Sequence, residues 1–292
     1  MVSKLKCYSI SAHGAKQIEA KKPLQDSSGR LDEAGDFIAI AVSDGHGGDK
    51  YFRSDQGAEF AVAVALDCVK ACFDEQVFVD AFTADESTDT DRKKRIAQLE
   101  ESIVWRWNEA VRQALEEHPF EAEELSALEA DVQDEMRDES SDSRARAYGA
   151  TLLVAVVGEG FWFGMHIGDG TFVVKQDGEY SQPIPLDERC VGPYTTSICA
   201  KDAIRYFHHA WGFDVPDAIL IASDGVDESF SSIEGLYGFY DTVIQSSLED
   251  WEGNITELEA YLPQLSAKGS RDDISLAWII NTGSTNSTSE EG

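Results

Sequence analysis

Basic side chains are scarce in this sequence of 292 residues. Lysine and arginine number 24 against 55 aspartate and glutamate residues, so the formal net charge is −31. A protein that binds nucleic acid needs a basic surface to neutralise phosphate groups. The composition therefore argues against nucleic acid as a partner, and it favours cations or basic proteins instead.

Cysteine is also sparse, and its spacing suits neither cross-links nor zinc. The five cysteines are odd in number and form no CxxC pair: Cys7, Cys68, Cys72, Cys190 and Cys199. This pattern disfavours a disulfide framework and a thiolate zinc site. Cys68 and Cys72 are four residues apart, so we expect them to be small core residues on one face of a helix.

Long apolar runs are missing as well. No stretch reaches the roughly 18 apolar residues that cross a membrane. The first residues, MVSKLKCYSISAHG, lack the apolar segment of a signal peptide. We therefore expect a cytoplasmic protein that does not contact membranes.

The hydrophobic content of 42% is sufficient for a substantial core, and its periodicity predicts strands and helices. After residue 148, turns at GEG and GDG predict a meander of three short strands. Apolar residues at helical spacing predict two helices, one after residue 61 and one through 96–114. Further strands and helices are expected at 6–11, 36–43, 216–225 and 273–280 (strands) and near 232–247 and 254–266 (helices).

Residues 121–142 hold ten acidic residues and one arginine. They lack the ligand spacing of a metal-binding loop, so a solvated segment is the default prediction, either as an acidic helix or as a mobile insertion. No linker interrupts the chain. We predict one domain over residues 1–281 that carries an acidic insertion at 121–146, followed by a disordered tail at 282–292.

Aspartates recur where the apolar strands begin or end. Asp44 and Asp224 each close a buried strand and precede a glycine, Asp169 occupies the GDG turn, and Asp272 starts the last strand. One Asp-Gly pair after a strand is most often a turn. Several carboxylates that converge at strand ends would repel one another, and a divalent cation removes that repulsion.

Carboxylate and carbonyl oxygens, without thiolates, favour Mg²⁺ or Mn²⁺. Two such ions bridged by a carboxylate can activate a water molecule. No HExxH spacing and no nucleophile-elbow pattern is present. Taken alone, the residues indicate a two-metal hydrolase or a metal-binding α/β protein, and they leave the reaction open.

Five motifs in a fixed order narrow this choice. VSDGHGG, GATLLVAVV, HIGDG, ILIASDGVDE and SRDDISLAWI resemble the metal-dependent serine/threonine phosphatases of type 2C, and their order extends over residues 5–281. The QD in PLQDSSG is similar to a bacterial branch of that family. The resemblance implies an α+β fold, a four-layer α-β-β-α sandwich in which helices flank two antiparallel sheets. It also implies hydrolysis of phosphoserine and phosphothreonine in proteins.

The resemblance further implies a dinuclear Mn²⁺ or Mg²⁺ centre and a looser third ion. By motif match, Asp44 would bridge the two ions and the Gly45 carbonyl would bind the second. Asp224 and Asp272 would hold the first ion. His46 matches the general acid for the leaving group. The remaining implied ligands are Asp26, near the second ion, and Asp169, at the third.

Some positions depart from the family pattern. The arginine that grips phosphate in the family falls on Lys21, and Lys22 could serve instead; both bind phosphate as point charges, without a bidentate grip. Gln25 stands where many relatives have glutamate, and we leave it out of the metal ligands. Residues 187–213 occupy the position of the substrate-facing flap without its usual pattern. We interpret His208 and His209 there as surface residues.

Two alternatives to the phosphatase remain open. One is a pseudophosphatase that binds a phosphoprotein or a kinase without turnover, and the other is a hydrolase for a small phosphate ester. For a phosphatase, the net charge favours substrates with basic residues around the phosphosite, such as a serine/threonine kinase or its targets.

Overall fold

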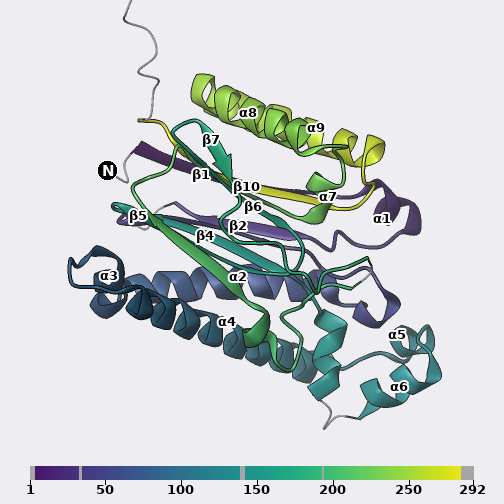
Figure 1. Ribbon diagram of the computed structural model, residues 1–292. Coiled ribbons are helices and arrows are strands. Elements are labelled where there is room, and N and C mark those ends of the chain that lie inside the picture. Colours follow the sequence, from purple (N-terminus) through teal and green to yellow (C-terminus); the bar gives the residue numbers. More distant parts are fainter. Residues whose placement is uncertain (1–3, 33–34, 139–141, 193, 284–292) are drawn as a thin grey trace, which may run out of the picture.

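A computed structural model describes residues 4–32, 35–138, 142–192 and 194–283. Two five-stranded antiparallel sheets stack face to face, and helices cover their outer faces (Figure 1). The expected α-β-β-α sandwich is therefore confirmed. In spatial order the first sheet consists of β1 (Leu5–Ala12), β10 (Ile274–Asn281), β9 (Ala218–Ala222), β6 (Thr171–Gln176) and β7 (Glu179–Ser181).

The second sheet carries the central apolar runs of the sequence. It consists of β2 (Ser27–Leu31), β3 (Phe37–Ser43), β4 (Leu152–Gly158), β5 (Phe161–Ile167) and β8 (His208–Phe213). Strands β3, β4 and β5 are buried at every position. Both faces of these strands are covered, so they are apolar throughout instead of alternating between apolar and polar residues.

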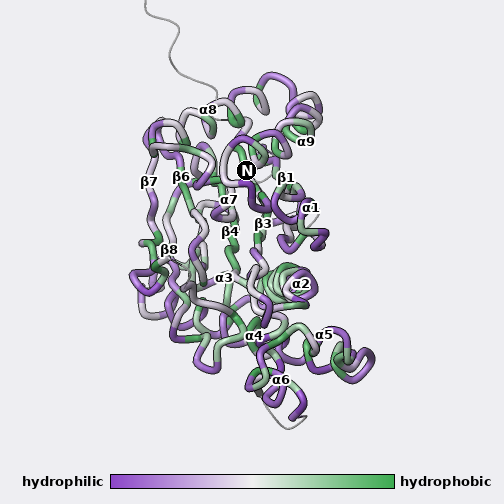
Figure 2. Tube along the Cα trace, turned by 90° about the vertical axis from the view of Figure 1, so that its right-hand side faces the viewer, coloured by the Kyte–Doolittle hydropathy of each residue, from purple (hydrophilic) through white to green (hydrophobic). Residues whose placement is uncertain are grey.

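Two long helices pack on each sheet. Helices α8 (Ile233–Glu249) and α9 (Trp251–Lys268) cover the first sheet, and α2 (Ser54–Phe73) and α4 (Asp89–Glu117) cover the second (Figures 1 and 2). Apolar side chains fill the three layers between these elements, as in the sheet-to-sheet contact of Ile40, Leu153 and Ile221. The remaining helices are α1 (Ala15–Ala20), α3 (Gln76–Thr83), α5 (Ala122–Ser126), α6 (Ala130–Arg137) and α7 (Asp224–Asp227), with 3₁₀ turns η2 (Asp49–Tyr51), η3 (Asp142–Tyr148) and η4 (Ala203–Tyr206).

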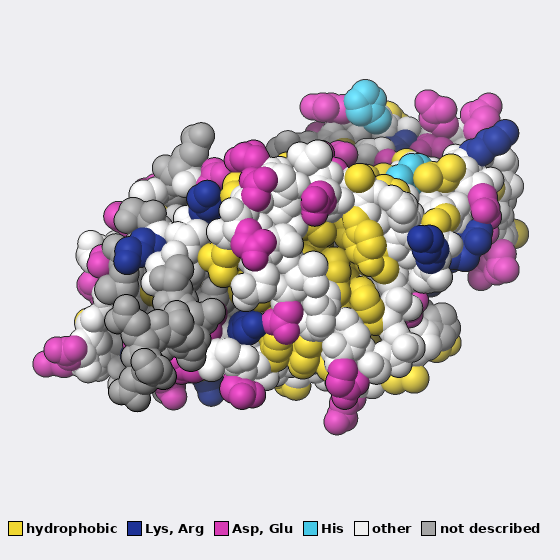
Figure 3. All heavy atoms as spheres, turned by 90° about the horizontal axis from the view of Figure 1, so that it is seen from above, with side chains coloured by type: hydrophobic (Ala, Val, Ile, Leu, Met, Phe, Trp, Pro, Cys, Tyr) yellow, Lys and Arg dark blue, Asp and Glu magenta, His cyan; other side chains and the backbone are white. Residues whose placement is uncertain are grey.

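The outer face of α8 and α9 illustrates the surface charge. Acidic side chains are spread over it, and an apolar groove lies between the two helices (Figure 3). Phe239, Leu258 and Tyr261 line this groove. The excess of acidic residues is thus displayed on the surface, which is where charged groups stay hydrated.

Most expected strands and helices are present, and Cys68 is buried in the core as expected. The predicted meander is wrong in one respect, because β4 and β5 pair in one sheet whereas β6 belongs to the other. The GDG turn is therefore the crossover between the sheets. The interpretation of His209 as a surface residue is also wrong: its ring Nδ1 lies 2.9 Å from the buried Glu100 carboxylate.

The acidic insertion is folded in its described part. Leu125 of α5, Met136 of α6 and Leu128 between the two helices belong to the core cluster beneath the second sheet. Arg53, also buried, donates hydrogen bonds to both carboxylate oxygens of Glu124 at 2.8 Å and ties α5 to the start of α2. Of the two predicted forms the segment thus takes that of acidic helices, and most of it lies at the surface while these three apolar residues pack on the core. The predicted tail falls mostly outside the described residues.

Candidate active site

The corner at residues 44–46 follows β3 and is held by the backbone of residues 149–151. The Asp44 N–H donates to the Thr151 hydroxyl at 2.9 Å, and the Thr151 N–H donates to the Asp44 carbonyl at 2.8 Å. Gly45 forms a β-bridge with Ala150. The His46 N–H donates to the Gly149 carbonyl at 3.1 Å. This short ladder fixes the corner independently of its side chains.

Gly45 is required by the close approach of other chain segments. A Cβ atom at this position would lie 2.5 Å from the Gln25 carbonyl oxygen and 2.7 Å from the Ser54 carbonyl oxygen. The Gln25 amide donates to the His46 carbonyl at 3.1 Å and to the Ser54 hydroxyl at 2.6 Å. Gln25 therefore braces the corner, which agrees with its omission from the expected ligands.

Four aspartates from distant parts of the chain gather at this end of the sandwich. Asp26 precedes β2, Asp44 follows β3, Asp169 lies between β5 and β6, and Asp224 follows β9. Burial, then Asp26 and Asp224, raises the pKa of Asp44 well above its usual range. Burial and then Asp169 raise the pKa of Asp224 to about 6. The shifts of Asp44 and Asp224 show that these carboxylates interact with one another at short range.

Asp26 is the most enclosed member of this group. It is 5% exposed and accepts a hydrogen bond from the Ser223 hydroxyl at 2.8 Å. Burial raises its pKa well above the usual range, the Ser223 hydrogen bond opposes this rise, and Asp273 and Asp224 add to it. An aspartate in such a setting is costly to ionise unless a cation compensates its charge.

The adjacent Asp272 and Asp273 have different surroundings. Asp272 lies at the rim, where its side chain contacts Gln17 and lies 3.7 Å from the Lys16 ammonium. Asp273 is 2% exposed and accepts hydrogen bonds from the N–H groups of Gly14 at 2.6 Å and Gln25 at 2.7 Å. Asp272 still acts on the pKa of Asp224. Asp273 therefore ties three chain segments together beside the predicted ligand.

His46 is packed behind the corner. Its ring is 4.7 Å from the ring of Tyr51, centroid to centroid, and a Cβ atom on Gly149 would lie 2.9 Å from its Cδ2. Burial and then the neighbouring Lys50 lower the pKa of His46 to about 4, so the imidazole is neutral at pH 7. Within the described ranges its Nε2 atom has no hydrogen-bond partner. This nitrogen is buried and leaves its hydrogen-bonding capacity unused within the described residues.

Of the two predicted phosphate-binding lysines, Lys22 is the one that reaches the corner. Its Nζ donates to the Gly47 carbonyl at 2.9 Å. Lys21 ends α1 in the left-handed conformation with φ of 56° and is exposed. Lys50 was missed by the sequence reasoning, although it stands four residues after His46 and acts on its pKa.

The donor set fits a hard divalent cation by its chemistry. All side-chain donors that gather here are carboxylates, and the Gly45 carbonyl lies among them on the same corner. Burial and neighbouring carboxylates raise the pKa values of Asp44 and Asp224. Across the parts of the chain that the structure describes, no three acidic, histidine or cysteine side chains are arranged to hold an ion. A cation here would therefore have to draw the carboxylates together, and it would offset the repulsion between them.

Comparison with known proteins decides the family. The family described as Protein phosphatase 2C matches residues 13–263, which include the whole corner, Asp26, Asp169 and Asp224. The chain belongs to this family. It is therefore a protein phosphatase of the serine/threonine type, as the motifs predicted. A comparison with curated proteins finds no match.

Solved structures of bacterial phosphatases share the fold. PppA, described as a key regulatory component of T6SS in Pseudomonas aeruginosa, is 16% identical with a TM-score of 0.56 over 94% of this chain and 97% of that chain. The catalytic domain of PstP, solved in complex with 2 manganese ions, is 16% identical with a TM-score of 0.53 over 94% and 97%. The S. agalactiae serine/threonine phosphatase is 14% identical with a TM-score of 0.55 over 94% and 99%.

Two further features complete the description of the phosphatase. Asp227, three residues after Asp224, has a pKa raised to about 8 by burial and then by Asp224. Asp227 is part of the motif ILIASDGVDE but was not among the predicted site residues, because its position in the sequence does not reveal that its side chain is buried. Separately, no helix within the described residues is long and apolar enough to cross a membrane.

Proposed function

We propose that this phosphatase hydrolyses phosphoserine and phosphothreonine in proteins by a mechanism that depends on two Mn²⁺ or Mg²⁺ ions. The observation that supports it is the convergence of buried aspartates from four distant segments, whose pKa values are raised by burial and by one another. A protein keeps such a cluster at a cost in stability, which is expected of a binding site. Bound ions would neutralise the phosphate and activate a water molecule.

The roles of individual residues follow the motif match. Asp44 would contact both ions, and Asp224 and Asp272 would complete the first position. The Gly45 carbonyl and Asp26 would serve the second. Asp169 with Asp224 would serve a looser third ion. The ladder to residues 149–151 and the brace from Gln25 would keep the Asp44 and Gly45 oxygens in place during turnover, because both rest on backbone hydrogen bonds.

His46 is proposed as the group that donates a proton to the leaving alkoxide. Its Nε2 faces no protein partner, and its pKa of about 4 leaves it neutral before substrate binds. A phosphate dianion beside the ring would favour the protonated imidazole and raise its pKa toward neutrality. The Tyr51 ring and the absence of a side chain at Gly149 would fix the orientation of the imidazole.

Lys22 is proposed as the phosphate-binding cation, with Lys21 as the weaker candidate. The Lys22 ammonium already lies on the corner, at the Gly47 carbonyl. Lysine carries a single compact charge, so it would attract the phosphate without the bidentate grip of arginine.

Protein partners with basic residues remain part of the proposal for contacts over the wider surface. The net charge of −31 supports it, because long-range attraction steers basic partners toward an acidic protein. A serine/threonine kinase or its targets would have this character. Association that is equally fast for acidic and basic partners at low salt would contradict the idea.

The deciding experiment measures Mn²⁺-dependent phosphate release from a phosphothreonine peptide. Wild type and Asp44→Asn are assayed side by side, with folding verified by circular dichroism. We expect turnover in wild type that EDTA abolishes and that falls at least about a thousandfold in Asp44→Asn, since that change removes a ligand of both ions. Binding without turnover by folded wild type would indicate a pseudophosphatase. Turnover of small phosphate esters alone would indicate a metabolic hydrolase.

A further inference from the structure

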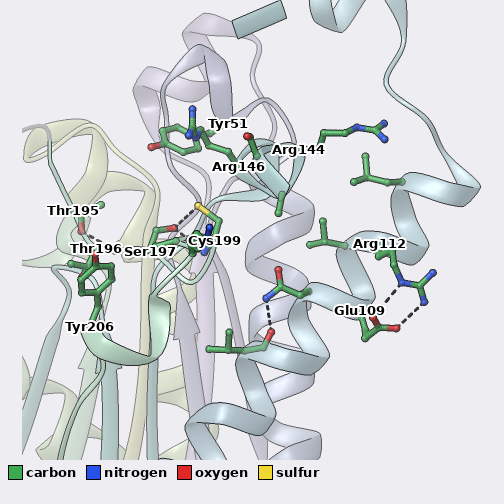
Figure 4. A pocket seen from close by; sticks show the side chains of 18 of the residues that line it. Tyr51, Glu109, Arg112, Arg144, Arg146, Thr195, Thr196, Ser197, Cys199 and Tyr206 are labelled. Carbon is green, nitrogen blue, oxygen red and sulfur yellow. Dashed lines mark hydrogen bonds and ion pairs between the residues drawn. The ribbon is translucent and has the colours of Figure 1, made fainter. Parts of the chain in front are cut away.

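A large pocket lies beside the catalytic corner. Its volume is about 1440 Å³, and its walls are α4, η3, residues 195–201 and Tyr206 of η4 (Figure 4). Tyr51 of η2, which follows the DGHGG corner, lines one end (Figure 4). We name it the side pocket. Part of its wall comes from residues 187–213, the position of the substrate-facing flap. The far wall is formed by α4 and by the acidic insertion.

The side pocket and the corner share the same backbone. The Ser197 hydroxyl donates to the Ala150 carbonyl at 3.0 Å, and Ala150 forms the bridge with Gly45. Tyr51 contacts the His46 ring at one end of the pocket. Burial raises the pKa of Asp169, and Thr195, which lines the side pocket, opposes this rise. A peptide bound with its phosphate at the corner would therefore continue into the side pocket.

The charge of the side pocket is opposite to that of the whole protein. Among the described residues that line it are five cations, Arg112, Arg144, Arg146, Arg189 and Lys201, and two acids, Glu109 and Glu116. The whole chain has 24 basic and 55 acidic residues. A local excess of cations in so acidic a protein indicates an anionic ligand.

Three of these cations are committed or directed elsewhere. Arg112 is held by Glu109 at 2.7 Å and Glu116 at 2.6 Å, and the Arg112–Glu109 pair lies far from Tyr51 in Figure 4. Arg189 is held by Asp187 at 2.7 Å. Arg144 lies over the Phe120 ring and extends away from the Tyr51 end (Figure 4).

Arg146 is the cation placed to contact a ligand near the phosphate. Its carbonyl accepts from the Gly149 N–H at 2.9 Å, so its backbone belongs to the turn that leads into the ladder. Its side chain extends toward the same end as Tyr51 (Figure 4). The Glu135 carboxylate of α6 holds it at 3.1 Å, and the two side chains are 40% and 32% exposed. A partly exposed ion pair of this kind is weak, so another carboxylate can replace Glu135.

We propose that the side pocket determines substrate specificity: Arg146 binds an acidic side chain of the substrate next to the phosphorylated residue, in exchange for Glu135. The proposal rests on the proposed function, because it assumes a phosphopeptide at the corner. It replaces the expectation of basic residues directly beside the phosphosite, and it leaves basic residues favoured only over the wider surface of a partner. A direct contact with this segment discriminates between phosphopeptides that differ at one residue, which long-range attraction between whole proteins does not.

The test compares two phosphothreonine peptides that differ only in acidic or neutral residues beside the phosphosite. At about 0.15 M salt the Debye length is about 8 Å, so repulsion from distant acids is largely screened. We expect wild type to favour the acidic peptide. Arg146→Ala should lower the acidic-to-neutral ratio of kcat/KM about tenfold, mainly through KM, because it removes a charge-assisted contact. Arg146→Lys should restore part of the preference.

Glu135→Gln should change the acidic-to-neutral ratio of kcat/KM in the direction opposite to Arg146→Ala, because it removes the other partner of the same ion pair. Removing the competing carboxylate should raise the acidic-to-neutral ratio roughly threefold. Arg95→Ala is the matched control, since Arg95 is a partly exposed residue of α4 outside the pocket lining, bonded to Gln98. It should leave the ratio unchanged.

Binding of the two peptides, labelled with a fluorophore and followed by anisotropy, separates this proposal from the proposed function. An Arg146-dependent preference in Kd without any turnover would support the side pocket and contradict the hydrolytic function. Turnover with a ratio that neither Arg146→Ala nor Glu135→Gln changes would overturn the side pocket and leave the hydrolytic function standing.

Discussion

The catalytic corner and the side pocket differ in how their charged groups are held. At the corner, Asp26 and Asp273 are buried and accept hydrogen bonds from a hydroxyl or from backbone N–H groups. In the side pocket, Arg112 and Arg146 are about half exposed and are paired with carboxylates that are themselves partly exposed. Buried groups with backbone partners have one arrangement, whereas exposed ion pairs exchange partners readily. The corner is thus suited to chemistry and the pocket to discrimination between substrates.

The two regions meet at residues 149–151, so a change there should affect both. Gly149→Ala would place a Cβ atom 2.9 Å from the His46 ring and 2.8 Å from the Tyr51 ring. Displacing both rings should lower kcat for phosphopeptides about a hundredfold, since small errors in position at a reacting centre are costly. Steady-state kinetics with a phosphothreonine peptide measures this effect.

Gly238→Ala is the control for Gly149→Ala. A Cβ atom at Gly238 would meet no other atom within 4 Å, and the residue lies on α8, which covers the opposite sheet. Gly160→Ala would not serve, because Gly160 has φ of 83° and an added side chain would strain its backbone. Full activity in Gly149→Ala would show that the ring positions at the corner are not decisive.

The side-pocket wall can be loosened without touching the corner carboxylates. Glu124→Gln leaves the Arg53 guanidinium, which is 7% exposed, without its charged partner. We expect a loss of about 2 kcal/mol, which is a drop in Tm of roughly 5 °C, because an unpaired buried charge is costly. Glu123→Gln, at an exposed neighbouring position, should leave Tm unchanged. Thermal unfolding followed by circular dichroism provides the measurement, and equal Tm values would contradict the anchoring role of Glu124.

The smallest expected effect concerns Asp227 near the corner, whose ionisation lowers the free energy of unfolding. Burial and Asp224 raise the pKa of Asp227 to about 8, whereas the unfolded value is near 4. The folded state therefore binds the proton more tightly, and stability falls as pH rises from about 4 to about 8. Asp227→Asn removes this cost, so Tm should increase by roughly 2–4 °C at pH 8 and by less at pH 5.

The histidines act in the opposite direction at lower pH. Burial lowers the pKa of His46 and of His166 to about 4, below the unfolded value near 6.5. Their contribution to stability is complete above pH 6.5 and is lost as pH falls toward 4. Between pH 4 and pH 6.5 the histidines therefore oppose Asp227, whereas the other buried aspartates of the corner act in the same direction as Asp227. Glu249→Gln, at an exposed position of α8, is the control for Asp227→Asn, and a gain that is equal at both pH values would contradict the assignment.

Motif order and apolar periodicity predicted much of this molecule. The strands at 36–43 and 273–280 and the helices near 232–247 and 254–266 correspond to β3, β10, α8 and α9. These elements are long or fully buried, so their side-chain patterns are unambiguous. Strand β8 was missed and residues 121–142 were left between an acidic helix and a mobile insertion, since their patterns are mixed and packing against distant residues stabilises them.

The site was predictable to the level of residue type. The Asp-Gly pairs named Asp44, Asp169 and Asp224, and the structure places these three carboxylates at one end of the sandwich together with Asp26. The sequence did not distinguish Asp272 from Asp273 in their surroundings, nor did it indicate Lys50 or Arg146. The surroundings of Asp272 and Asp273 arise from neighbours that are more than two hundred residues away, and those of Lys50 and Arg146 from which nearby side chains they meet in the folded chain.

By itself, the sequence determined the family, the two-sheet sandwich and the acidic character of the surface, because motif identity, apolar periodicity and charge composition are local properties of the chain. Only the tertiary structure decided that β4 and β6 lie in different sheets, that the acidic insertion is anchored by Arg53, and that a cationic pocket opens beside His46. These features depend on long-range pairing, on desolvation and on which charges meet in space, and none of these is encoded in the spacing of residues along the chain.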